Sequence, residues 1–184
     1  MKKQWPYFLL VFVLPVTAVL WWWGLFSAAT LQVADRGGYY YAYLEAQGAY
    51  SKLETRQKEV QHALKQQGVE TGAQITVVLS DPRTTSYKEL RAHTGYIVSD
   101  QAKLVAPLRL GFIPRRRVAI ASIKAHPLFA YGKTYSALLA YARENKMSLR
   151  LPTVELFNDS VLQVEMPLAP HEIKTLDNNT GGHP

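Results

Sequence analysis

The chain of 184 residues contains no cysteine. Disulfide bonds, thiol nucleophiles and cysteine-ligated metal sites are therefore excluded. The histidines show no metal-ligand spacing, and no Ser/His/Asp arrangement can be recognised in the sequence. The five stand at His62, His93, His126, His171 and His183. We expect no metal and no other cofactor, and we assign no catalytic residue.

Acidic residues and tryptophan are both scarce over long stretches. Residues 103–150 hold ten Lys and Arg residues against the single acid Glu144. Such an imbalance hints at an anionic partner or surface, although a solvated basic face is the commoner explanation. All four tryptophans, Trp5 and Trp21–Trp23, stand near the N-terminus. Any aromatic binding surface in the rest of the chain must therefore use another aromatic residue.

Charge is absent from residues 7–29, a run of 23 residues. As a helix this run would reach roughly 34 Å, which exceeds the hydrocarbon core of a membrane at about 30 Å. Two lysines before the run outweigh Arg36, which Asp35 offsets, so the positive-inside rule places the N-terminus in the cytoplasm. We predict a transmembrane anchor over residues 1–30, with the bilayer as its partner. The alternative is a cleaved signal peptide, whose apolar core is usually shorter, about 7–15 residues.

This anchor would make the chain a single-pass protein of the inner or plasma membrane. The soluble domain would then lie on the periplasmic, extracytoplasmic side, behind a linker at residues 31–36.

Two short stretches of the chain occur twice in the same order. The tetrapeptide AYSK at residues 49–52 returns as AYGK at residues 130–133, and TVVLS at residues 76–80 returns as TVELF at residues 153–157. Two matches in the same order suggest an internal duplication. Glu155 is the position at which the second copy departs from the first, and we expect function there.

Hydrophobic periodicity predicts the order strand, helix, strand, strand twice over. Residues 100–115 are expected to connect the halves, and the polar tail at residues 170–184 is expected to be disordered. The expected strands are residues 39–44, 74–80 and 90–98 in the first half and 118–125, 153–157 and 161–166 in the second, with helices at residues 50–67 and 131–146.

The two βαββ halves, the Ser80-Asp81-Pro82 that closes the third element of the first half, and the Pro152-Thr153-Val154-Glu155 run resemble the GyrI-like domain over residues 37–169. That family includes effector-binding domains of bacterial transcription activators and stand-alone small-molecule binders. The resemblance implies an α+β fold in which one curved antiparallel sheet, a duplicated βαββ, has both helices on one face and a ligand groove on the other. It also implies a glutamate at the groove floor, ringed by aromatics, which receives lipophilic cations in the drug-sensing members; Glu155 matches that position.

Strand alternation assigns side chains to faces independently of the resemblance. Val154 and Leu156 share one face, which suits packing under helices, and leave the other face to the groove. By the proposed repeat, Val78 lines the opposite half of the groove. Alternation along the strand at residues 39–44 makes Tyr41 and Tyr43 the candidates for its aromatic walls. The predicted ligand-binding residues are Glu155, Phe157, Thr153, Val78, Tyr41 and Tyr43.

A carboxylate in an apolar groove costs several kcal/mol of desolvation unless it is protonated, hydrogen-bonded or paired. A cationic ligand removes that cost, and tyrosine rings add cation–π attraction of about 0.5–2 kcal/mol. We therefore expect a membrane-anchored small-molecule-binding module. Its apolar groove with a central glutamate suits lipophilic ligands, including cationic ones. The alternative is that Glu155 lies on a solvent-exposed surface of the sheet or forms an ion pair with a lysine or arginine.

Two other functions are weighed against this one. The first is a membrane-tethered adaptor domain that docks an unidentified protein partner. The second follows from the resemblance, because some GyrI-like proteins are hydrolases that act through a glutamate and groove aromatics. The absence of tryptophan after Trp23 argues against that activity, so we do not expect an enzyme.

The triplet Arg115, Arg116 and Arg117 is a candidate membrane-surface contact, because each charge near anionic head groups is worth about 1 kcal/mol. A solvated strand edge is the commoner role for such a triplet. Nucleic-acid binding is disfavoured, since no recognised binding motif accompanies the basic charge and the expected membrane span takes the place of a helix-turn-helix.

Overall fold

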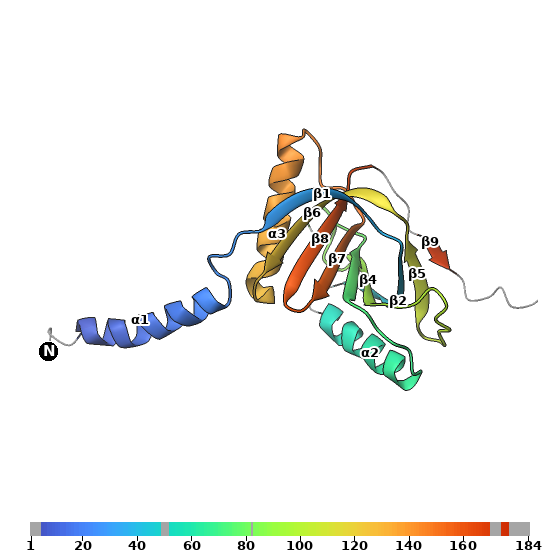
Figure 1. The fold of residues 1–184 in the computed structure, drawn as a ribbon, viewed down its shortest axis with the longest axis horizontal. Helices are drawn as coiled ribbons and strands as arrows, with labels where there is room; N and C mark the ends of the chain where they lie inside the picture. The colour runs from blue at the N-terminus through green and yellow to red at the C-terminus, as the bar shows by residue number, and fades with distance from the viewer. Residues whose placement is uncertain (1–4, 49–51, 82, 170–173, 177–184) are drawn as a thin grey trace, which may run out of the picture.

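The computed structural model describes residues 5–48, 52–81, 83–169 and 174–176. Figure 1 shows a curved sheet with α2 and α3 packed against it and α1 leading into it. The elements are α1 (Trp5–Trp22), β1 (Thr30–Arg36), β2 (Tyr39–Gln47), α2 (Leu53–Gln66), β3 (Gln74–Val78), β4 (Arg91–Ile97), β5 (Arg109–Ile113), β6 (Arg116–Lys124), α3 (Pro127–Glu144), β7 (Thr153–Asn158), β8 (Val161–Pro167) and β9 (Lys174–Leu176).

The strands form one nine-stranded antiparallel sheet in the order β1-β6-β8-β7-β3-β4-β2-β5-β9. Strand–helix–strand–strand occurs twice along the chain, as β2-α2-β3-β4 and as β6-α3-β7-β8. The two halves meet where β3 pairs with β7, and there Thr76 lies opposite Glu155. The position that breaks the sequence repeat therefore lies at the seam between the halves.

The expected fold class is wrong in its strands, because three more strands extend the sheet. β1 forms from the expected linker and pairs with β6 along its whole length, so the sheet begins before residue 37. β5 forms from the expected connector and pairs with the free side of β2. β9 forms from part of the expected disordered tail, the remainder of which lies outside the described residues.

The expected transmembrane anchor is also wrong. Within the part of the chain that the structure describes, no helix is both long enough and apolar enough to cross a membrane. α1 has 18 residues and ends at Trp22, which gives it a length of roughly 27 Å. The chain turns at Gly24, whose φ of 81° is open to glycine at little cost, so the uncharged run does not continue as one helix to Ala29. This finding overturns the anchor, the single-pass membrane localisation and the bilayer as a partner.

α2 and α3 cover the same face of the sheet. Directly paired residues share a face, and the pairs run continuously from Ala42 through Tyr96, Gln74 and Phe157 to Leu162. Ala42 packs with Val60 and Leu64 of α2. Leu162 packs in a second cluster with Ala119, Ala121 and Leu138 of β6 and α3. The helices therefore bury two separate apolar clusters, one on each half of the sheet.

The opposite face is concave and has a core of its own. Its buried residues are Tyr41, Tyr43, Ile75, Val77, Ile113 and Val154. The hydroxyl of Tyr39 on β2 donates to Oε1 of Glu165 on β8 at 2.9 Å, although β7, β3 and β4 lie between these strands. In a flat sheet β2 and β8 would be about 19 Å apart, at about 4.8 Å per strand. The sheet therefore bends strongly toward this face.

Candidate functional site

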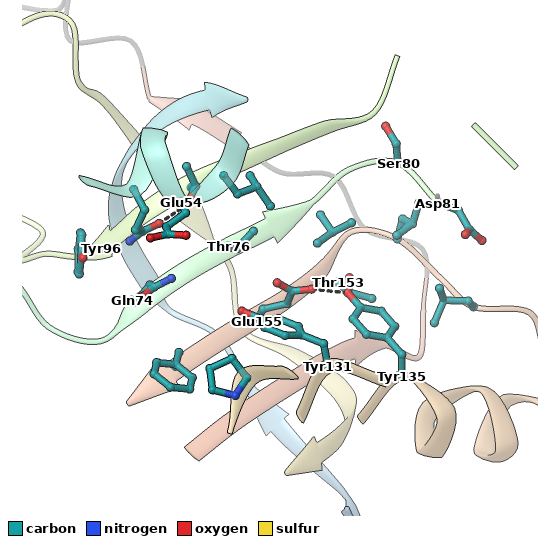
Figure 2. A pocket seen from close by; sticks show the side chains of 18 of the residues that line it. Glu54, Gln74, Thr76, Ser80, Asp81, Tyr96, Tyr131, Tyr135, Thr153 and Glu155 are labelled. Atoms are coloured by element: carbon teal, nitrogen blue, oxygen red, sulfur yellow. Dashed lines mark hydrogen bonds between the residues drawn. The ribbon is translucent and has the colours of Figure 1, made fainter. Parts of the chain in front are cut away.

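A pocket with a volume of about 840 Å³ lies between α2 and α3, over the seam where β3 pairs with β7. Its floor consists of side chains from these two strands, and each helix supplies one wall (Figure 2). The floor is lined by Gln74, Thr76, Val78, Thr153, Glu155 and Phe157, the α2 wall by Leu53, Glu54, Gln57, Lys58 and Gln61, and the α3 wall by Pro127, Tyr131, Tyr135 and Leu139.

The expectation that helices and groove occupy opposite faces is wrong, because this pocket lies on the helix-covered face. The reason is where the helices pack. α3 contacts β1, β6 and β8, and α2 contacts β2 and β4. Each helix thus lies over the outer strands of its own half and leaves the central strands β3 and β7 uncovered between them. The gap between the helices is the pocket.

Four of the predicted ligand-binding residues line this pocket, namely Glu155, Thr153, Phe157 and Val78. Tyr41 and Tyr43 do not, because both are 0% exposed in the core of the concave face. The Tyr41 hydroxyl lies 3.1 Å from Nδ1 of His93, and the Tyr43 ring stacks on the same imidazole with centroids 4.0 Å apart. The prediction that these two tyrosines form groove walls is therefore corrected: they are core residues.

The aromatic wall comes instead from Tyr131 and Tyr135 of α3 (Figure 2). The sequence carried a signal for them, since both fall on one helical stripe with Leu138 and Ala142. In the structure only Leu138 and Ala142 are buried under the helix, and the two tyrosines turn toward the gap between the helices.

Glu155 is the buried carboxyl of the pocket floor, with 8% of its surface exposed. The Tyr135 hydroxyl donates to its Oε1 at 2.6 Å and also lies 3.1 Å from Oγ1 of Thr153. Burial raises the pKa of Glu155 to about 7, and the hydrogen bond from Tyr135 offsets only part of that rise. Burial, followed by the negative charge of Glu155, raises the pKa of Tyr131 to about 12. Glu155 is thus held in a pocket where its ionised form is disfavoured.

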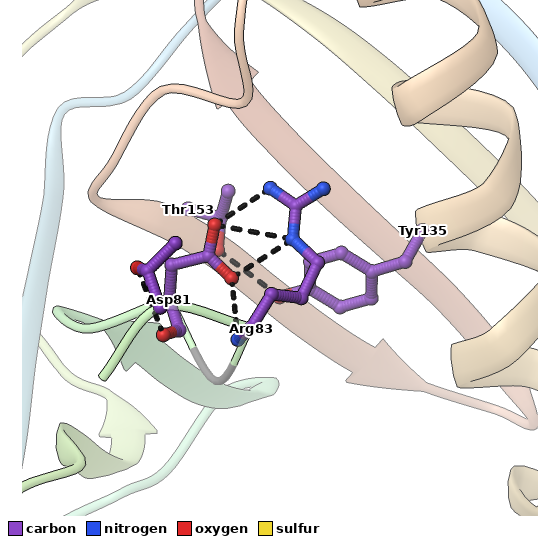
Figure 3. A network of polar contacts seen from close by, with 5 residues as sticks. Asp81, Arg83, Tyr135 and Thr153 are labelled. Carbon is purple, nitrogen blue, oxygen red and sulfur yellow. Dashed lines mark hydrogen bonds and ion pairs between the residues drawn. The ribbon is translucent and has the colours of Figure 1, made fainter. Parts of the chain in front are cut away.

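The other charged side chains of the pocket lie at its rim and are paired. Lys58 donates to Glu54 at 2.7 Å on α2. Arg83 and Asp81 approach to 2.6 Å and lie close to Thr153 and Tyr135 (Figure 3). The hydrogen bonds from Arg83 lower the pKa of Asp81 below its ordinary value. Among the described residues, no Lys or Arg forms an ion pair with Glu155.

The α2 wall also contains a fixed polar group, the amide of Gln57. This side chain is 6% exposed. Its Nε2 donates to the carbonyl of Gly95 at 2.7 Å, and the Thr94 hydroxyl donates to its Oε1. Because both ends of the amide are engaged within the protein, Gln57 shapes the wall and leaves Glu155 as the charged group available to a ligand.

Arg115, Arg116 and Arg117 do not form one surface. Arg116 is only 9% exposed, faces the concave core, and donates from Nη2 to the carbonyl of Pro152 at 3.2 Å. Arg117 pairs with Asp35 of β1 at 3.4 Å, and Arg115 is exposed. Alternation along β6 sends neighbouring side chains to opposite faces, so the prediction of a shared lipid-binding triplet is wrong. Across the described ranges, no three His, Asp or Glu residues gather in a way that could hold a metal ion.

No family model and no curated protein matches the chain. Among solved structures, the chain is similar to a chain in the cryo-EM structure of an EcmrR–DNA complex in EcmrR-RPo, with a TM-score of 0.62 and 11% sequence identity. The match covers 88% of this chain and 64% of that chain, so this chain spans somewhat less than two thirds of its length. The likeness shows the fold alone. Because that structure contains DNA, the expected exclusion of nucleic acid has no support.

Proposed function

We propose that the pocket between α2 and α3 binds a lipophilic small molecule that carries one positive charge. The observation that carries this proposal is Glu155, a carboxyl that is 8% exposed and is paired with none of the described Lys or Arg residues. Burial of an unpaired carboxylate costs several kcal/mol, and a cationic ligand offsets that cost while a neutral one does not. A structural acid would instead be paired within the protein.

The rest of the pocket suits such a ligand. Its volume of about 840 Å³ lies within the range of about 300–1,000 Å³ common for small-molecule sites. Tyr131 and Tyr135 place two aromatic rings beside Glu155, and cation–π attraction adds about 0.5–2 kcal/mol. The paired charges at the rim cancel one another, so Glu155 sets the sign of the charge that the pocket prefers.

The proposal agrees with the resemblance to the GyrI-like family. The duplicated strand–helix–strand–strand order and a glutamate at the seam are the features of this chain that resemble its effector-binding members. The chain also shares its fold with the EcmrR chain, whose structure is a complex with DNA.

The test compares two ions of one shape and opposite charge, tetraphenylphosphonium and tetraphenylborate, by isothermal titration calorimetry. Wild type is expected to bind the cation and to reject the anion. Glu155→Gln is expected to lower the affinity for the cation at least about tenfold, because a buried charge pair is lost. Glu89→Gln, which removes an exposed acid outside the pocket, is the matched control and leaves the affinity unchanged. Equal affinity in wild type and Glu155→Gln contradicts the proposal, as does tight binding of the anion.

A further inference from the structure

The segment between α1 and β1 is docked onto the start of α3. The backbone N–H of His126 donates to the carbonyl of Trp23 at 2.9 Å, and the two rings stack with centroids 4.5 Å apart. Gly24 lies so close to this point that a Cβ on it would be 2.8 Å from the Cβ of Ala125. His126 is also the N-cap of α3 and accepts a hydrogen bond from the N–H of Leu128. The contact therefore involves the end of the helix that forms the pocket wall.

Lys133 of α3 holds the same segment by its side chain. Its Nζ donates to the carbonyl oxygens of Gly24 at 3.1 Å, Leu25 at 2.5 Å and Ser27 at 2.5 Å. A lysine ammonium has three hydrogens, and these three acceptors use all of them. No ion pair of Lys133 occurs among the described residues, so its charge is stabilised by backbone carbonyls of the segment.

The pocket lies on the other flank of the same two helical turns. Tyr131 and Tyr135 stand two residues before and after Lys133, and an α-helix rotates by about 100° per residue. Their side chains consequently leave the helix about 200° away from that of Lys133. A ligand that contacts the tyrosines and the segment that contacts Lys133 therefore act on one rigid element from opposite sides.

We propose that Lys133 is a positioning residue that couples occupancy of the pocket to the segment at residues 23–27 and, through it, to α1. This inference rests on the proposed function of the pocket. A ligand that fixes Tyr131 and Tyr135 shifts α3, and the three carbonyls held by Lys133 follow that shift. Coupling of this kind is reciprocal, so the segment must also alter the affinity of the pocket, typically by about 5-fold to 150-fold.

The chain contains its own reporter of this coupling, because every tryptophan belongs to α1 or to this segment. Trp23 is 37% exposed and stacked, whereas Trp5, Trp21 and Trp22 are 75%, 72% and 89% exposed. Emission excited selectively from tryptophan therefore senses the junction and not the pocket itself. Trp23→Phe identifies the part of the signal that comes from the stacked ring.

The experiment follows tryptophan emission and calorimetric affinity together while tetraphenylphosphonium is added to the full chain. Wild type is expected to bind and to change its emission. Lys133→Met is expected to bind at least about fivefold more weakly, without the emission change, and Lys133→Arg to restore both, since a guanidinium can also donate to several carbonyls. Glu155→Gln controls for adsorption of the cation to the exposed apolar side chains of α1.

The outcomes separate this inference from the proposed function. If wild type and Lys133→Met bind the cation equally and neither changes its emission, the coupling is wrong and the binding function stands. If wild type does not bind, the proposed ligand class is wrong, and the coupling is tested without ligand. Tyr135→Phe then frees α3 from Glu155 and is expected to shift the Trp23 emission, whereas Tyr87→Phe, which alters an exposed tyrosine, is not. Identical spectra of these two variants overturn the coupling.

Discussion

Replacement of Glu155 by glutamine is predicted to stabilise the protein at neutral and alkaline pH while it weakens the binding of a cationic ligand. Glutamine has nearly the same shape and can still accept the hydrogen bond that the Tyr135 hydroxyl now donates at 2.6 Å. It carries no charge, so the desolvation cost of the carboxylate disappears. A residue kept for stability would show the opposite result, a loss of stability on replacement.

The magnitude follows from the pKa of Glu155. Burial raises it from 4.5 to about 7, so the folded protein binds more protons than the unfolded chain between these pH values. The free energy of unfolding contributed by this group therefore falls as the pH rises through the window. At about 1.4 kcal/mol for each pKa unit, the total loss is about 3 kcal/mol, complete at about pH 8. Glu155→Gln should be more stable than wild type by up to that amount at about pH 8 and nearly equal to it at about pH 4.5.

The assay is urea denaturation of both proteins at a series of pH values. The difference between them isolates Glu155, because other groups titrate in both. His93 is one of these: its pKa is lowered to about 4, chiefly by burial, and its contribution to stability rises with pH where that of Glu155 falls. Glu89→Gln, at an exposed position, should track wild type throughout. A difference that does not change with pH, or a destabilised Glu155→Gln at about pH 8, would show that burial does not disfavour the ionised form of Glu155.

Two further predictions concern the packing of the concave face and the pocket acid. Gly111→Ala should lower the free energy of unfolding by about 1–3 kcal/mol or more, because its Cβ would lie 2.4 Å from Cζ of the buried Tyr41 ring. Gly132→Ala, in the open on α3, should instead stabilise by about 0.5–1 kcal/mol in the same denaturation experiment, and equal effects would contradict the packing described. Tyr135→Phe removes a hydrogen bond that lowers the pKa of Glu155, so that pKa should rise above about 7 in an NMR titration of the carboxyl carbon, and an unchanged or lower value would be incompatible with the site.

Part of the site could be predicted from the sequence because strand alternation is local. Thr153, Glu155 and Phe157 share a face by period alone, and the structure places all three at the pocket. Alternation does not say which face the helices cover. That face is decided by the packing of each helix over the outer strands of its half. The sequence therefore predicts Tyr41 and Tyr43 in the groove, whereas the structure places them in the concave core.

The predictions of a transmembrane anchor and of the number of strands are wrong for the same reason. Both features depend on contacts between residues far apart in the sequence. The uncharged run leaves the helix after Trp22, and Lys133, which holds the next turn, is more than 100 residues away. β1 likewise forms a strand because it pairs with β6, with Thr30 opposite Ser122. Composition and periodicity describe neighbours along the chain and cannot supply such partners.

A cationic ligand that binds beside the carboxylate of Glu155 must displace the proton that this group holds. Titration of tetraphenylphosphonium into the full chain at about pH 6, in two buffers of different ionisation enthalpy, counts the protons released per bound cation. This cation has no proton to exchange, and a carboxyl with a pKa of about 7 is about nine-tenths protonated at that pH, so close to one proton should leave wild type and none should leave Glu155→Gln. Binding without proton release from wild type, or the same release from Glu155→Gln, would show that the cation does not bind beside the Glu155 carboxylate.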